Sequence, residues 1–137
     1  MADFVLIDFE GEPPRPIEAR RGKQSPLKDV VGMMLSFASA TFSAVDRLIA
    51  GEGGEEHAID RTALIEWAQV WQDAATSQFL CSYREGMAVK PDLLPPPREA
   101  QILLDAYLLE KALHELLYDL DNRPSCVWIP LHSILAL

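Results

Sequence analysis

The stretch REAQILLDAYLLEKALHELLYDLDNRP, residues 98–124, decides the fold class. Its apolar side chains recur mostly at helical spacing, and they are Leu103, Tyr107, Leu109, Leu113, Leu116, Leu117 and Leu120. The run Asn122-Arg123-Pro124 ends the pattern, because proline disfavours helical geometry in the residue before it. The stretch therefore predicts a long helix over residues 98–121.

A second long helix is predicted over residues 26–49. Ser25-Pro26 places a capping hydroxyl before a proline at the first helical position, and Gly51 is a natural stop. The apolar side chains at mostly helical spacing are Val30, Met33, Met34, Phe37, Val45, Leu48 and Ile49. The run GEGGEE at residues 51–56 predicts an acidic, flexible connector.

A third long helix is predicted to begin at Asp60, a capping residue, and to extend to Gly86. Its inward stripe would hold Leu64, Trp67, Ala68, Trp71, Ala75, Phe79 and Tyr83. Trp67 and Trp71, four residues apart, could form a platform for a sugar ring, but packing in the core is the favoured interpretation. Pro130 predicts a short terminal helix through Leu135.

The N-terminal run FVLIDF, residues 4–9, is a strand candidate that Gly11 and the prolines after it bring to an end. One strand cannot pair its own backbone groups. Three explanations stay open: a hairpin partner in the proline-rich stretch, pairing with another chain, or a larger parent protein. The predicted fold class is mainly α, in one domain over residues 1–137. Residues 1–24 would form a strand or hairpin and a proline-rich loop that carries Asp-Phe-Glu, and residues 25–137 a helical subdomain of three long helices and a short terminal one.

The composition is globular and acidic. The chain has 137 residues, is 49% hydrophobic and carries a formal charge of −9, which disfavours nucleic acid and anionic membranes as partners. The longest uncharged stretch, Val30 to Val45, is too short to span a membrane. The N-terminus has no signal-peptide pattern, and Cys81 and Cys126 have no metal-binding spacing. We therefore expect a cytoplasmic protein with reduced thiols.

Two groups of residues could carry chemistry. Asp8-Phe9-Glu10 follows the apolar run directly, and an acid at a strand exit is a common metal ligand, although solvated acids are the favoured interpretation from the residues alone. Lys111, His114 and Tyr118 share one face of the third predicted helix, and Asn122 extends it. With Arg123 this face could donate hydrogen bonds to hydroxyl groups, but a solvated face is favoured on spacing alone.

Two further patterns give little indication of a functional site. The glycines of residues 51–54 lack the Lys and Ser or Thr of a phosphate loop, and the neighbouring glutamates would repel phosphate. His57 and His132 have no partner at metal-ligand spacing, so we expect surface or loop histidines.

Three separated blocks of the chain resemble the maltokinase family, whose members are often fused to trehalose synthase. The first is IDFEGEP at residues 7–13, and the second is Arg20-Arg21 with SPLKDVVGM at residues 25–33. The third is LEKALHEL at residues 109–116 with Tyr118, NRP at 122–124 and VWIPL at 127–131. The blocks occur in the family's order and span nearly the whole chain.

The resemblance implies a bilobed fold like that of protein kinases and aminoglycoside phosphotransferases. It implies transfer of the γ-phosphoryl group of ATP to the anomeric hydroxyl of maltose, with Mg²⁺, giving maltose 1-phosphate for α-glucan synthesis. Asp8 would be the Mg²⁺ ligand, and Asp8 with Glu10 would contact the cofactor. The maltose contacts would be Lys111, His114, Tyr118, Asn122 and Arg123. The family usually has tyrosine where His114 stands.

The chain also departs from the family. Members carry a catalytic loop like His-Gly-Asp-Leu-His before the Asp-Phe-Glu strand, together with a nucleotide-binding N-lobe, and His-Gly-Asp occurs nowhere here. We therefore expect the C-terminal part of a helical lobe that has no catalytic residue and is inactive alone. Its partners would be maltose and the missing N-terminal half or trehalose synthase. Two alternatives stay open: one half of a split kinase, or a non-catalytic sugar-binding or self-assembly module that forms homo-oligomers through the exposed strand.

Overall fold

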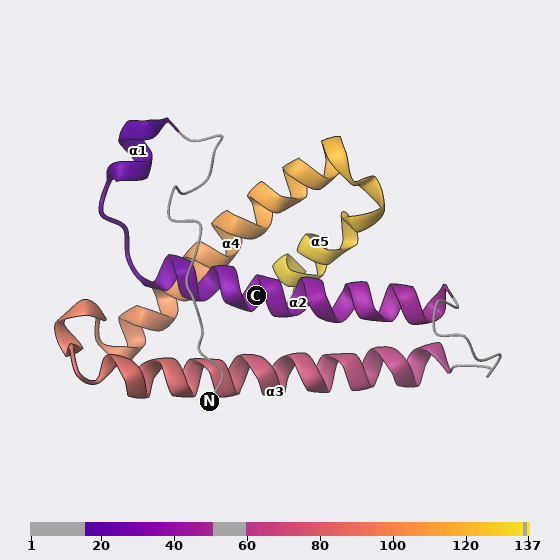
Figure 1. The fold of residues 1–137 in the computed structure, drawn as a ribbon, viewed down its shortest axis with the longest axis horizontal. Helices are drawn as coiled ribbons and strands as arrows, with labels where there is room; N and C mark the ends of the chain where they lie inside the picture. Colours follow the sequence, from indigo (N-terminus) through magenta and orange to yellow (C-terminus); the bar gives the residue numbers. More distant parts are fainter. Residues whose placement is uncertain (1–15, 51–59, 136) are drawn as a thin grey trace, which may run out of the picture.

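The computed structural model describes residues 16–50, 60–135 and 137, and the regular elements among them are helices. In chain order the elements are α1 (Ile17–Arg21), α2 (Leu27–Ile49), α3 (Arg61–Met87), η1 (Pro91–Leu93), α4 (Pro97–Asn122), η2 (Pro124–Cys126) and α5 (Trp128–Leu135). Helices α2 and α3 run side by side (Figure 1). Helix α4 crosses α2 obliquely, and α5 turns back from the end of α4 onto α2.

The predicted fold class is wrong for the described part of the chain. Residues 16–50 and 60–135 contain no strand and no sheet, so they do not show the kinase-like fold that the resemblance implied. Their apolar residues follow the helical period, and the helices bury them against one another without a sheet as a support. The predicted strand at residues 4–9, with Asp8 and Glu10, lies outside the described residues.

The long helices begin and end close to the predicted residues because local signals fix them. Asp60 caps α3 as predicted, since its Oδ1 accepts hydrogen bonds from the backbone N–H groups of Thr62 at 3.0 Å and Ala63 at 3.3 Å. The Oγ of Ser25 accepts from the N–H of Leu27 at 3.3 Å at the start of α2.

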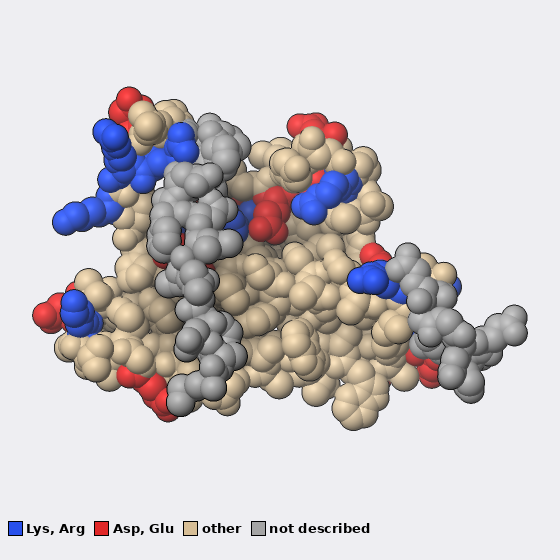
Figure 2. All heavy atoms as spheres, in the orientation of Figure 1, with Lys and Arg blue, Asp and Glu red and all other residues tan. Residues whose placement is uncertain are grey.

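The segment before α2 differs from the prediction of a loop, because residues 17–21 form the short helix α1. Glu18 lies in its first turn and Arg20 and Arg21 in its last, an order that complements the helix dipole. Figure 2 shows basic side chains gathered over α1.

Helix α2 is the centre of the packing. Its residues Leu27, Val30, Val31 and Leu35 form one buried cluster with Leu104 of α4, and its Ala38 and Phe42 form a second cluster with Ile129 of α5. Lys28 adds a polar link to α4, because its Nζ lies 3.2 Å from an Oε of Glu110 and 5.0 Å from the centre of the Tyr107 ring. Two of the apolar residues that define the helical pattern of α2, Met33 and Leu48, are exposed.

Helix α3 packs only along one side, and none of its residues is fully buried. Trp67 is 73% exposed and Trp71 is 53% exposed, so the expectation that both pack in the core is wrong. Trp71 still makes an edge contact with Phe37 of α2, with ring centres 6.5 Å apart. In Figure 2 the surface over the middle of α3 is largely uncharged.

No helix within the described ranges is both long enough and apolar enough to cross a membrane.

The buried cluster around Leu104 makes a matched test of the packing. Leu104 is 4% exposed and Leu117, on the same helix, is 63% exposed. We expect Leu104→Ala to lower the free energy of unfolding by about 2–5 kcal/mol, because it leaves a cavity. Leu117→Ala should change it by less than about 0.5 kcal/mol. Urea unfolding of both variants checks this, and equal losses would contradict the packing described here.

Tyr83 gives a pH test of the same cluster. Burial raises the pKa of its hydroxyl above 10.0, and the negative charge of Asp29 raises it further. The folded state therefore holds this proton more tightly than the unfolded state does, so its stabilising effect is complete below pH 10.0 and is lost as the pH rises through the raised pKa. We compare the free energies of unfolding of wild type and Tyr83→Phe. Their difference should be constant around neutral pH, and in the alkaline range the wild type should become less stable relative to the variant. A difference that is flat throughout would contradict the prediction.

Candidate functional site

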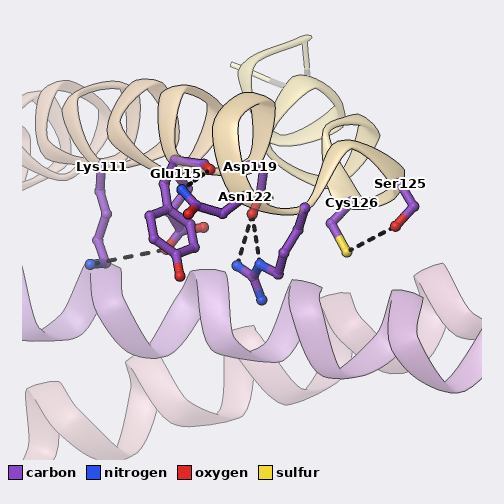
Figure 3. A network of polar contacts seen from close by, with 8 residues as sticks. Lys111, Glu115, Asp119, Asn122, Ser125 and Cys126 are labelled. Atoms are coloured by element: carbon purple, nitrogen blue, oxygen red, sulfur yellow. Dashed lines mark hydrogen bonds and ion pairs between the residues drawn. The ribbon is translucent and has the colours of Figure 1, made fainter.

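The last three turns of α4 carry a stripe of alternating charge. Lys111, Glu115, Asp119 and Arg123 are spaced by four residues, so consecutive turns bring them to neighbouring positions. Figure 3 shows Lys111, Glu115 and Asp119 on the side of α4 that faces α2. The stripe extends just past the end of α4 at Asn122, because Arg123 is the residue that caps the helix.

Asp119 and Arg123 form the tightest contact of this stripe. The Nε of Arg123 donates to Oδ1 of Asp119 at 2.9 Å, and its Nη2 lies 2.8 Å from the same oxygen. Asp119 is 3% exposed, whereas the side chain of Arg123 is 59% exposed. The buried carboxylate therefore holds one edge of the guanidinium and leaves much of the group open to solvent.

Tyr118 and Asn122 join Arg123 at the end of the helix. The guanidinium carbon of Arg123 lies 5.3 Å from the centre of the Tyr118 ring, which is a cation–π distance. The Nδ2 of Asn122 donates to the backbone carbonyl of Tyr118 at 2.9 Å. Because the amide nitrogen of Asn122 donates to the backbone of its own helix, the amide oxygen is left as an acceptor.

Lys111 lies against α2. Its Nζ is 4.0 Å from Oε1 of Glu115, and its Cε would be 4.0 Å from a Cβ placed on Gly32 of α2. Figure 3 shows the side chain of Lys111 reaching across to α2. The glycine therefore gives the lysine stem room to rest on the neighbouring helix.

Only some of the predicted sugar-contacting residues lie together in the structure. Tyr118, Asn122 and Arg123 contact one another directly, and Lys111 lies two turns earlier on α4. His114 is exposed, and its Nδ1 lies 2.9 Å from the backbone carbonyl oxygen of Glu110 on its own helix.

Sequence reasoning missed Glu115 and Asp119 as members of this site. Their spacing of four residues from Lys111 and Arg123 is a signal that could have found them. The burial of Asp119 had no signal in the sequence, because the sequence pattern does not distinguish a buried acidic residue of a helix from an exposed one.

A cavity of about 310 Å³ lies elsewhere, between α2, α3, α4 and α5. His132, predicted to be a surface or loop histidine, belongs to α5 and lines this cavity, with its ring centre 5.3 Å from that of Phe42. Within the described ranges no group of three or more His, Cys, Asp and Glu side chains is arranged to hold a metal ion.

Removing Arg123 tests the pair that it forms with Asp119. We expect Arg123→Ala to lower the free energy of unfolding by about 1–3 kcal/mol, because a buried carboxylate oxygen loses its donors. The double variant Asp119→Asn with Arg123→Ala should be more stable than Arg123→Ala alone. Arg98→Ala, an exposed arginine in the first turn of α4, is the matched control and should have little effect. Equal stability of the Arg98 and Arg123 variants would contradict the role given to the pair.

Comparison with known proteins shows that the sequence is similar to a sugar kinase. No family model matches the chain. A glucosamine kinase from Streptacidiphilus jiangxiensis is 29% identical to it over 136 residues, which cover 93% of this chain and 26% of the relative. The chain thus spans about a quarter of the length of this curated relative. The similarity is to a sugar kinase-like protein, and not specifically to a maltokinase.

Proposed function

We propose that this chain carries the sugar-contacting part of an ATP-dependent sugar kinase, and that maltose is the sugar. The observation that carries the proposal is the group of Tyr118, Asn122 and Arg123, held together at the end of α4 and open to solvent. The similarity to a glucosamine kinase supports the class of reaction. The three blocks that resemble maltokinases support the choice of maltose.

The chemistry of these side chains suits a sugar. Tyr118 is 56% exposed and offers the edge and part of the face of an aromatic ring to a pyranose. Arg123 offers N–H groups beyond those bound to Asp119, and the Asn122 oxygen is an acceptor. Sugar hydroxyls both donate and accept, so this mixture of groups can satisfy several of them.

Asp119 is a positioning residue in this proposal. It holds the guanidinium of Arg123 through two nitrogen atoms before any ligand arrives. A side chain that is already ordered loses less entropy on binding, so the ion pair favours affinity without touching the sugar.

We propose that phosphoryl transfer needs groups beyond this chain. The reaction depends on positioning and on stabilising charge, and the sequence has no His-Gly-Asp run to orient the sugar hydroxyl. Asp8 and Glu10, which would contact Mg²⁺ and ATP in the parent enzyme, lie outside the described residues. No step of the reaction is therefore assigned to the described residues, whose proposed part is to bind and orient the sugar.

A second candidate is a helical module that binds no sugar and assembles with copies of itself. The observation that favours it is the row of exposed apolar side chains on α3, which includes Trp67, Val70 and Trp71. Exposed apolar surface of this kind marks interaction sites in many proteins.

Calorimetric titration with maltose tests the first proposal, with trehalose as the control sugar. We expect maltose to bind and trehalose to give no saturable heat. Lys111→Ala and Tyr118→Ala should each weaken the affinity for maltose about tenfold, which corresponds to about 1.4 kcal/mol. Leu113→Ala, a substitution at an exposed leucine of the same helix, should leave the affinity unchanged.

Two outcomes would overturn this proposal. One is the absence of maltose binding by the folded chain. A sedimentation coefficient that increases with protein concentration would then favour the module that assembles with copies of itself. The other is equal affinity for both sugars in the wild type and in the two variants. Release of ADP by the pure chain with ATP, Mg²⁺ and maltose would contradict the separate claim that the catalytic groups lie elsewhere.

A further inference from the structure

The cavity beneath α4 is built from residues that the proposed sugar contacts do not use. Its volume of about 310 Å³ falls at the lower end of the range of small-molecule sites, which is about 300–1,000 Å³. The floor is apolar and comes from Met34, Leu35 and Ala38 of α2 and Leu108 of α4. None of Lys111, Tyr118, Asn122 and Arg123 lines it.

One wall of the cavity is polar and comes from α3. Gln69, Gln72, Asp73, Thr76 and Ser77 recur at spacings of three, four, seven and eight residues from the first, so they share one face of the helix. A helix face turned toward a neighbouring helix is normally apolar. On α3 the polar residues Gln72 and Thr76 are half-buried at the cavity, while Asp73 and Ser77 are exposed at its rim.

Gln72 has a hydrogen-bond acceptor that the described structure leaves without a partner. Its side-chain oxygen Oε1 is buried and has no hydrogen-bond partner among the described residues. Burying an unpaired amide oxygen is costly, so such groups in native proteins have a reason, such as a bound water or ligand. The residue therefore calls for a donor inside the cavity.

Two of the donors at the cavity are already used. The Nε2 of Gln69 already donates to Oδ1 of Asp73 at 2.9 Å, and the Oγ of Ser133 already donates to the backbone carbonyl of Ile129 at 3.3 Å. Both donors are thus directed at the protein. A ligand that completes the cavity must bring its own N–H or O–H groups.

The charge of the lining selects among such ligands. Asp73 carries the formal negative charge of the cavity, and no Lys or Arg is among the described residues that line it. Asp73 is exposed at the rim of the cavity, where its carboxylate repels an anion and attracts a cation more strongly than a neutral alcohol. A cation with N–H groups meets both requirements.

We propose that this cavity binds a small organic ammonium ion. Its N–H groups donate to Oε1 of Gln72 and to the carboxylate of Asp73, and its carbon skeleton lies on the side chains of Met34 and Leu35. The proposal rests on the cavity alone and does not depend on the proposed sugar contacts on α4.

The test compares three probes that share one ring: cyclohexylamine, cyclohexanol and cyclohexanecarboxylate, each added at pH 8 to the full chain. The readout is NMR of methionine methyl groups labelled with carbon-13. Met34 lines the cavity, and its neighbour Met33 is exposed on another side of α2, so Met33 is an internal control. We expect cyclohexylamine to move the Met34 signal saturably and to leave the Met33 signal in place. Cyclohexanol should bind about tenfold more weakly, and the carboxylate should not bind.

Two variants separate the charge from the acceptor. Asp73→Asn should weaken cyclohexylamine about tenfold, to the level of the alcohol, and Gln72→Leu should weaken all saturable binding while raising the urea midpoint of unfolding. Asp105→Asn is the matched control, because Asp105 accepts from Gln101 at 2.8 Å in the same four-residue arrangement on α4, away from the cavity. It should leave binding unchanged.

Any of three results would overturn the proposal. The first is that no probe moves Met34, in which case the cavity holds water only. The second is that all three probes act alike. The third is unchanged affinity for cyclohexylamine in Asp73→Asn, a variant that keeps the size of the side chain and therefore keeps the test valid if Gln72→Leu fails to fold.

Discussion

The burial of α2 on more than one side is the constraint on which the other long helices depend. Val30 and Val31 are adjacent in the chain, so they point in directions about 100° apart, yet each is 1% exposed. A helix that buries so wide an arc must be covered by more than one neighbour. Helices α3 and α4 provide that cover, and α5 extends it over Phe42. The cavity lies where α2, α3, α4 and α5 meet around Ala38.

The bounds of the helices could be predicted from sequence because local signals set them. Asp60 and the prolines around residue 96 act within a few residues of where they stand. The burial of individual side chains was harder to predict, because it depends on which other helix packs against each face. The periodic pattern of α3 contains two tryptophans, and only contact with α2 decides that Trp71 touches Phe37 while Trp67 remains exposed. The fold class failed for two different reasons. Its strand came from the apolar run FVLIDF, which lies outside the described residues, and its kinase-like fold came from the resemblance and not from the helical pattern of residues 26–135.

The candidate site divides in the same way. Lys111, Tyr118, Asn122 and Arg123 were found from helical spacing and resemblance, and the structure groups the last three. Asp119 was missed because it contributes to the site as a buried carboxylate, and the spacing of residues does not predict burial. The cavity had no sequence signal at all. Its lining comes from four helices, and a polar stripe such as Gln69, Gln72 and Asp73 is ordinarily interpreted as a solvated face.

The contacts that order the end of α4 are formed inside a single helix. Asn122 binds the backbone of Tyr118, and Arg123 binds Asp119 and covers the Tyr118 ring, each within five residues of its partner. These bonds therefore join no second long helix, although the burial of Asp119 depends on what packs over it. Under the proposed function, substitutions far from Asp119 can change the stability of the fold while Tyr118, Asn122 and Arg123 keep their mutual contacts. Stability and the proposed sugar recognition could then be adjusted separately, by evolution or by an engineer.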